Sequence, residues 1–131
     1  MKLSNSTKYA LMAAGYIASH PEDGNIKAPT ISQEYNIPSE FLLKILQQLC
    51  RAGILQGKRG PRGGYVAGRD PSEITLLQII EAIDGSASNF NFAEQTKNEP
   101  FALRMTTICE KAEIEQNKIL SKSTLAEIIR R

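Results

Sequence analysis

The sequence predicts a mainly α-helical fold with a small β-hairpin: a winged helix-turn-helix domain followed by a long C-terminal dimerisation helix. Three observations lead to this fold class. Three helical patterns open the chain, two short β-like runs follow around a glycine-rich connection, and a capped fourth helix comes next. In the 131-residue chain, we expect the winged domain over 1–85, a linker over 86–100 and the dimerisation helix with a short terminal helix over 101–131.

The first helix is expected over residues 4–19, opened by Ser4 or Ser6. Apolar side chains recur there at helical spacing, which predicts one buried face. The predicted face consists of Tyr9, Met12, Ala13, Tyr16 and Ile17.

A helix-turn-helix unit is expected next. Its first helix covers about 28–35, with Pro29 in the first turn, where a missing amide costs nothing. The second helix covers about 39–52, and Gly53 supplies its C-terminal stop. The buried stripe predicted for this second helix is Leu42, Ile45, Leu46 and Leu49.

The hairpin is predicted from two runs of strand-forming residues, 54–56 and 64–67. The fourth helix follows at a capping-box pattern formed by Thr75 and Gln78, and Gly85 ends it.

The C-terminal helix has an apolar stripe that a domain of this size has little core left to cover. We interpret the stripe as a dimer seam, with packing on the chain's own domain as the alternative. Its members are Phe101, Met105, Ile108, Ala112 and Ile119. Thr124 and Glu127 then cap a last short helix.

Charge is distributed unevenly along the chain, although the formal net charge is only +2. Between Glu40 and Asp70 there are six basic residues and no acidic one, which leaves 10 basic and 14 acidic residues, a balance of −4, elsewhere. The six are Lys44, Arg51, Lys58, Arg59, Arg62 and Arg69. A concentrated basic segment indicates an anionic partner more than the net charge does.

The segment 57–68 combines five glycines with three basic side chains, Lys58, Arg59 and Arg62. A phosphate loop of an enzyme would need a lysine after the glycines, then Ser or Thr and a helix, and none of these follows. A plain turn explains the glycines, Gly60 among them, but not the cations. A wing over 57–64 that enters the minor groove of DNA explains both.

The helix over 39–52 is then the helix that reads the major groove, and its exposed residues are candidate contacts. They are Ser39, Glu40, Leu43, Lys44, Gln47 and Arg51. Glutamate suits a cytosine amino group, leucine a thymine methyl and glutamine an adenine, whereas Lys44 and Arg51 suit phosphates. For each residue alone, a solvated helix face is the alternative.

Three stretches carry a resemblance to a known family: MKLSNSTKYAL, IPSEFLLKILQQLCRAGIL and KRGPRGGYVAGRDPSEITLLQIIEAIDG. They resemble the Rrf family of bacterial winged-helix transcription regulators, from Met1 to about Gly85. The resemblance implies a homodimer, a palindromic double-stranded operator and repression, with Arg59 as the minor-groove arginine. Leu43 departs from family members that have a polar residue there.

The resemblance also implies an iron–sulfur cluster in members with three cysteines after the fourth helix, and this chain lacks them. It has only Cys50 and Cys109, with one histidine, His20, at a helix end. We therefore expect no cofactor and no metal site within a protomer. An unknown small-molecule or redox signal stays open.

An alternative function is a winged-helix module that binds proteins and never DNA. An enzyme is not expected, because no pairing of a nucleophile or acid with a base stands out around the single histidine. No run is long enough to span a membrane, and the two cysteines do not form a disulfide framework, so we expect a cytoplasmic protein.

Overall fold

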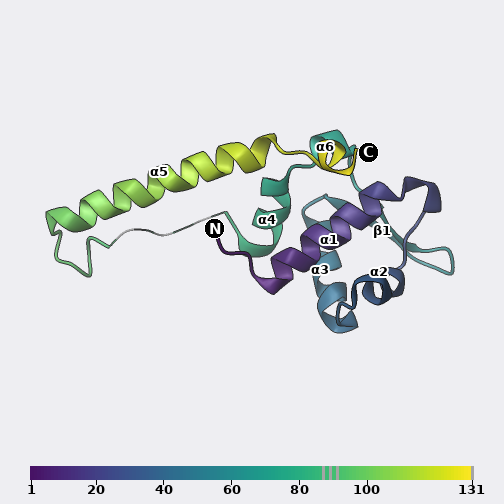
Figure 1. Cartoon of the computed structure of the whole chain (residues 1–131). Helices are drawn as coiled ribbons and strands as arrows, with labels where there is room; N and C mark the ends of the chain where they lie inside the picture. Colours follow the sequence, from purple (N-terminus) through teal and green to yellow (C-terminus); the bar gives the residue numbers. More distant parts are fainter. Residues whose placement is uncertain (87, 89, 91, 131) are drawn as a thin grey trace.

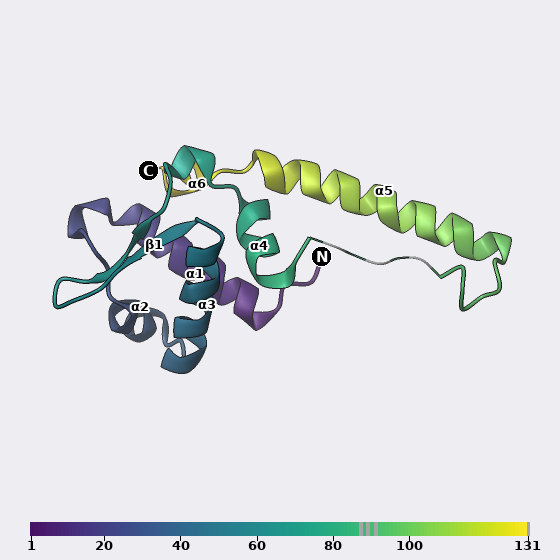
Figure 2. The ribbon, with the colours of Figure 1, turned by 180° about the vertical axis from the view of Figure 1, so that it is seen from behind.

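The computed structural model describes residues 1–86, 88, 90 and 92–130. It confirms the predicted fold class: a helical chain with one two-stranded antiparallel hairpin. The elements are α1 (Asn5–Ser19), the 3₁₀ turn η1 (Pro21–Asp23), α2 (Ala28–Tyr35), α3 (Ser39–Arg51), β1 (Leu55–Lys58), β2 (Gly64–Ala67), the 3₁₀ turn η2 (Pro71–Glu73), α4 (Leu76–Asp84), α5 (Pro100–Lys122) and α6 (Leu125–Ile129). Figures 1 and 2 show α1 to α4, α6 and the hairpin gathered at one end, with α5 extending away as an arm.

Helix α1 begins at Ser4, whose side chain accepts a hydrogen bond from the Thr7 amide, and it ends at His20. Its buried face differs in part from the predicted one, since Ala13 and Ile17 are buried as predicted but Met12 is not. Ala10, Ala13 and Ala14 are fully buried, whereas Met12 is 38% exposed. Small side chains allow α1 to pack closely against α3 and α4, so alanines form much of its buried face, together with Ile17.

Helix α3 buries the predicted stripe of Leu42, Ile45, Leu46 and Leu49, each no more than 2% exposed. It ends at Ala52 in a Schellman arrangement. The Ile54 amide donates to the Leu49 carbonyl and the Gly53 amide to the Cys50 carbonyl, with Gly53 at φ +75°. The chain therefore turns from α3 toward the hairpin directly after the buried Leu49.

The hairpin pairs β1 with β2 in the register Leu55–Ala67 to Lys58–Gly64. The second strand has the predicted bounds, but the first begins at Leu55 rather than at Ile54 and runs on to Lys58. Ile54 is fully buried; its backbone amide donates to the Leu49 carbonyl at the end of α3, and its carbonyl accepts from the Gly68 amide just after β2. The shift leaves residues 59–63 as the turn between the strands.

The predicted capping box at the start of α4 is present. The Thr75 hydroxyl accepts from the backbone amide of Gln78, and the side-chain carbonyl of Gln78 accepts from the backbone amide of Thr75. The C-terminal part of the chain lies beside the start of α4. Thr75 pairs with Thr124 in an isolated bridge, and Leu125 of α6, 3% exposed, packs into the same core as α1 and α3. The end of the chain therefore completes the core of the winged domain.

Helix α5 contacts α4 and carries a row of exposed apolar side chains. Among the described residues, helices with the length and hydropathy needed to cross a lipid bilayer do not occur.

Replacing Thr75 with alanine should lower the free energy of unfolding by about 1 kcal/mol, because it removes the hydroxyl that caps α4. Urea denaturation at a fixed protein concentration measures this change. The control is Thr107→Ala, where the hydroxyl bonds only to the Leu103 carbonyl within an exposed turn of α5. We expect a change within about 0.5 kcal/mol there. Equal losses in the two variants would contradict the role of the cap.

Candidate nucleic-acid interface

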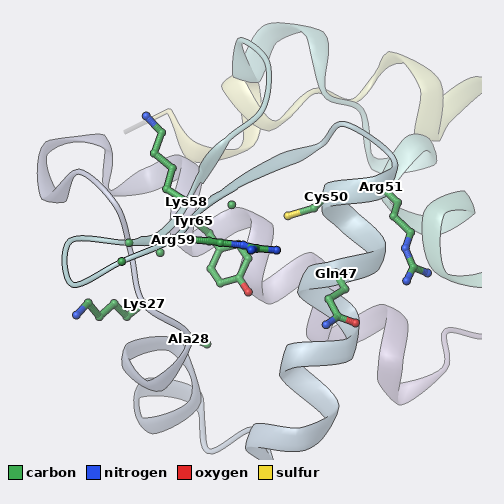
Figure 3. Close-up of a pocket in the computed structure, with 12 residues that line it drawn as sticks. Lys27, Ala28, Gln47, Cys50, Arg51, Lys58, Arg59 and Tyr65 are labelled. Atoms are coloured by element: carbon green, nitrogen blue, oxygen red, sulfur yellow. The ribbon is translucent and has the colours of Figure 1, made fainter.

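A groove of about 630 Å³ lies between α3, the hairpin and the N-terminal end of α2 (Figure 3). We call it the basic groove and the hairpin, residues 55–67, the wing. The groove is lined by Lys27, Ala28, Gln47, Cys50, Arg51, Gly57, Lys58, Arg59, Gly60, Gly63, Gly64 and Tyr65.

The basic groove brings five of the predicted contact residues together. Gln47 and Arg51 come from the last two turns of α3, and Lys58, Arg59 and Gly60 come from the wing. Figure 3 shows the side chains of Gln47 and Arg51 on α3 and that of Arg59 lying across the groove from the wing. The remaining predicted residues lie just outside this lining: Ser39, Glu40, Leu43 and Lys44 are exposed on the first turns of α3, and Arg62 is exposed in the wing turn.

The groove is positively charged and its charge is not offset locally. Among the described residues that line it there are four cationic side chains, on Lys27, Arg51, Lys58 and Arg59, and no carboxylate. Over the part of the chain that the structure describes, the one ion pair joins Lys118 to Glu115 on α5, with Nζ 3.2 Å from Oε1. The four cations therefore remain available to an anionic ligand.

Two glycines allow the wing to fold as it does. A Cβ at Gly63 would collide with the Lys58 carbonyl oxygen across the turn. Gly64 has φ +141°, and a Cβ there would lie 2.7 Å from the Ile26 carbonyl oxygen. The glycines thus serve close backbone approach within the protein.

The wing is bound to the α1–α2 connection by backbone and side-chain hydrogen bonds. Ile26 and Tyr65 exchange two backbone bonds, of 2.9 and 2.8 Å. The Asn25 side-chain amide donates to the Arg62 carbonyl at 2.8 Å, and Lys27 Nζ donates to the Pro61 carbonyl at 2.9 Å. Together these bonds hold the turn of the wing beside the start of α2.

Sequence reasoning missed Asn25, Lys27, Ala28 and Tyr65 as parts of this site. The signal that was available is the polar–apolar–polar alternation of Asn25, Ile26 and Lys27, which is the pattern of a short edge strand.

Two weak acids at the floor of the groove stay neutral at ordinary pH. Burial raises the pKa of the Cys50 thiol, and a hydrogen bond from the Gly57 backbone offsets part of this shift. Burial also raises the pKa of the Tyr65 phenol, and the neighbouring Cys50 adds to it. Neither group therefore reduces the positive charge of the groove.

A family described as "Rrf2: Iron-dependent Transcriptional regulator" matches residues 3–131. The HTH-type transcriptional regulator IscR of Photorhabdus laumondii is 34% identical over 86 residues, which cover 66% of this chain and 52% of that protein. IscR of Aliivibrio salmonicida is 35% identical over 86 residues, covering 66% of this chain and 51% of that protein. The chain thus spans about half the length of these relatives.

Solved structures of similar proteins extend the likeness over nearly the whole chain. CymR, described as the global cysteine regulator of B. subtilis, has a TM-score of 0.73 and 25% identity, covering 98% of this chain and 96% of that one. IscR of T. potens has a TM-score of 0.77 at 24% identity, covering 98% of this chain and 86% of that one, and at this identity the likeness shows the fold alone.

The residues present do not fit the iron that the family description names. Cys50 is half-buried on α3 and Cys109 half-buried on α5, so the two thiols lie on different helices. Within residues 1–86, 88, 90 and 92–130, groups of three or more His, Cys, Asp or Glu that could hold a metal ion do not occur. A protomer therefore lacks, in its described part, the ligand set of an iron or iron–sulfur site.

Replacing Asn25 with alanine and Lys27 with methionine should loosen the wing, because the double variant removes both side-chain bonds to the wing turn. Hydrogen exchange of the Gly63 amide, which bonds to the Gly60 carbonyl, should become about tenfold faster. NMR measures this rate, with the core amide of Ile79 as internal reference. Lys118→Met on α5 is the matched control and should leave the rate unchanged. An unchanged Gly63 rate in the double variant would contradict the proposed restraint.

Proposed function

Because this chain belongs to the Rrf2 family of transcriptional regulators, we propose that it is a homodimeric, sequence-specific DNA-binding transcription regulator, and a repressor. The family resemblance predicted from the sequence is thereby confirmed. The relatives are named as HTH-type transcriptional regulators, and the proposal extends that role to this chain. The observation that carries it is the basic groove, in which α3 and the wing present cations on one surface.

In the proposed complex, α3 lies in the major groove with its first turns against the base edges. Glu40 and Gln47 are the hydrogen-bonding candidates: the carboxylate accepts from a cytosine amino group, and the amide pairs with adenine. Lys44 and Arg51 neutralise phosphates and fix the register of the helix without specifying sequence. Ser39, at the N-terminus of α3, completes this face.

The wing enters the adjacent minor groove in this arrangement. Arg59 carries the guanidinium that is inserted, because a narrow minor groove concentrates negative potential. Lys58 and Arg62 hold the flanking phosphates, and Gly60 at φ +97° lets the backbone pass close to the strand. The bonds from Asn25 and Lys27 hold the wing in place before DNA arrives.

The second protomer is proposed to pack on α5. The predicted stripe is exposed in the single chain: Phe101 is 47% exposed, Met105 52%, Ile108 66% and Ile119 69%, and Ala112 is exposed as well. Exposed side chains of this size along one helix need a partner. A two-fold dimer would present two basic grooves to the two halves of a palindrome.

We further propose that this regulator works without a bound cluster or metal, in the cytoplasm, and without enzymatic activity. The lack of fit between Cys50, Cys109 and an iron site supports the first point. A small-molecule or redox signal is compatible with this function.

Selection of bound duplexes from a randomised DNA pool tests the function directly. The proposal expects a shared half-site repeated with two-fold symmetry. The alternative, a winged-helix module that binds proteins, expects no enrichment and no binding to random duplex at low salt. The salt dependence separates the two, since DNA binding through phosphates weakens steeply as salt rises.

Replacing Arg59 with alanine should weaken binding to the selected duplex and reduce the salt dependence of log Kd by about one unit of slope. Fluorescence anisotropy at several salt concentrations measures both. Arg104→Ala is the matched control, since Arg104 is exposed in the N-terminal part of α5. Figure 1 shows that this end of α5 lies far from the hairpin. Unchanged affinity and slope in the Arg59 variant would refute its role in the minor groove.

Replacing Ile108 with glutamate should raise the dimer dissociation constant by about 100-fold or more, because a two-fold seam receives the charge twice. Sedimentation velocity over a concentration series measures this. Ile128→Glu on α6 is the control, because Ile128 is 52% exposed and lies off the stripe. A dimer that tolerates Ile108→Glu would place the interface elsewhere.

A further inference from the structure

A second, smaller cavity of about 80 Å³ lies where the N-terminal ends of α2 and α3 meet. Its lining is mostly apolar, and we call it the apolar notch. The lining residues are Ala28, Pro29, Ser32, Ser39, Leu42 and Leu43.

Leu43 is one of the exposed residues that line this notch. It is 47% exposed, although its neighbour Leu42 is fully buried and anchors α3 in the core. Glu40 and Lys44, on the same exposed face, are charged. A leucine at this position therefore contributes little to the core of the protomer, and its exposed surface is available to a ligand.

The two hydroxyl groups of the notch are already engaged within the protein. Ser32 Oγ donates to the Ile37 carbonyl at 2.6 Å, and it lies 3.3 Å from Ser39 Oγ. The notch therefore offers an apolar surface, and a polar ligand group placed there would lose its hydrogen bonds to water.

The size of the notch restricts what enters it. A volume of about 80 Å³ corresponds to roughly two or three water-sized groups. A methyl group with the ring carbon that bears it fits this space, whereas an aromatic side chain or a peptide segment does not.

The apolar notch is adjacent to the basic groove, because Ala28 lines both. A duplex held by the cations of the groove would bring base edges of the major groove to the first turns of α3. The notch therefore lies where base edges are expected, an argument that rests on the proposed function.

We propose that the apolar notch recognises the C5-methyl group of a pyrimidine and that Leu43 is a specificity-determining residue. In the major groove, thymine is the standard base that presents such a methyl group. The same chemistry occurs in 5-methylcytosine, so the base that carries the methyl is decided by experiment. Each half-site then contains one pyrimidine that is read through its methyl group.

The test starts from the duplex recovered by selection, in which thymines are replaced by uracil one position at a time in both half-sites. At one thymine per half-site, loss of the methyl should weaken binding about fourfold, or roughly 15-fold for both half-sites together. A second pair of duplexes carries cytosine or 5-methylcytosine at that position. The methylated form should bind more tightly than cytosine by a similar factor.

Two variants assign the effect to the notch. In Leu43→Ala the thymine-to-uracil ratio should fall to near one, because the apolar contact is gone. In Lys44→Ala, the matched control in the next position, both duplexes should bind more weakly while their ratio stays the same. Anisotropy titrations measure all of these affinities.

The outcomes separate this inference from the proposed function. Tight binding to the selected duplex with equal affinity for thymine and uracil at every position would overturn the methyl recognition and leave DNA binding intact. Half-sites with neither an invariant thymine nor a cytosine at which C5-methylation tightens binding would overturn it as well. A methyl effect that persists in Leu43→Ala would remove Leu43 from the role, and failure to bind any duplex would defeat both proposals.

Discussion

The defined shape of the basic groove depends on the attachment of the wing to residues 20–27, which connect α1 and α2. Two backbone bonds between Ile26 and Tyr65, with the side-chain bonds of Asn25 and Lys27, add to the β1–β2 ladder and fix the glycine-rich hairpin against the rest of the domain. Without this attachment, the cations of Lys58 and Arg59 would be spread over many conformations, and the basic groove would not have a defined width. The binding surface is therefore preorganised, and less conformational entropy has to be lost when a ligand arrives.

The core explains how α3 keeps its place opposite the wing. The fully buried alanines of α1 allow close packing on α3, and the Schellman end at Gly53 directs the chain from α3 into β1. Leu125 returns from the far end of the chain to the same core, so α6 ties the arm formed by α5 to the winged domain. In a dimer built on α5, this connection would set how the two basic grooves are oriented.

The sequence was most informative where the determinants are local. The capping box at Thr75, the stop at Gly53 and the stripe of α3 were all predicted, because each depends on residues within a turn or two of one another. The start of β1 was misplaced by one residue, because the Ile54 backbone amide closes the end of α3 and only its carbonyl bonds across the hairpin, to the Gly68 amide. The buried face of α1 was predicted only in part, at Ala13 and Ile17, because large side chains outweigh alanines in an apolar pattern. Within the candidate site, the alternation of Asn25, Ile26 and Lys27 indicates an extended segment, but their contacts depend on a pairing with the distant wing that this local pattern does not specify.

In the proposed complex, α3 and the wing form one surface that binds a single DNA duplex. Titration of ¹⁵N-labelled protein with the selected duplex tests this most directly. We expect the amides of Leu43 and Lys44 on α3 and those of Gly63 and Tyr65 on the wing to shift together, with one dissociation constant. Shifts confined to one of these two elements, with the other unaffected at saturation, would contradict it.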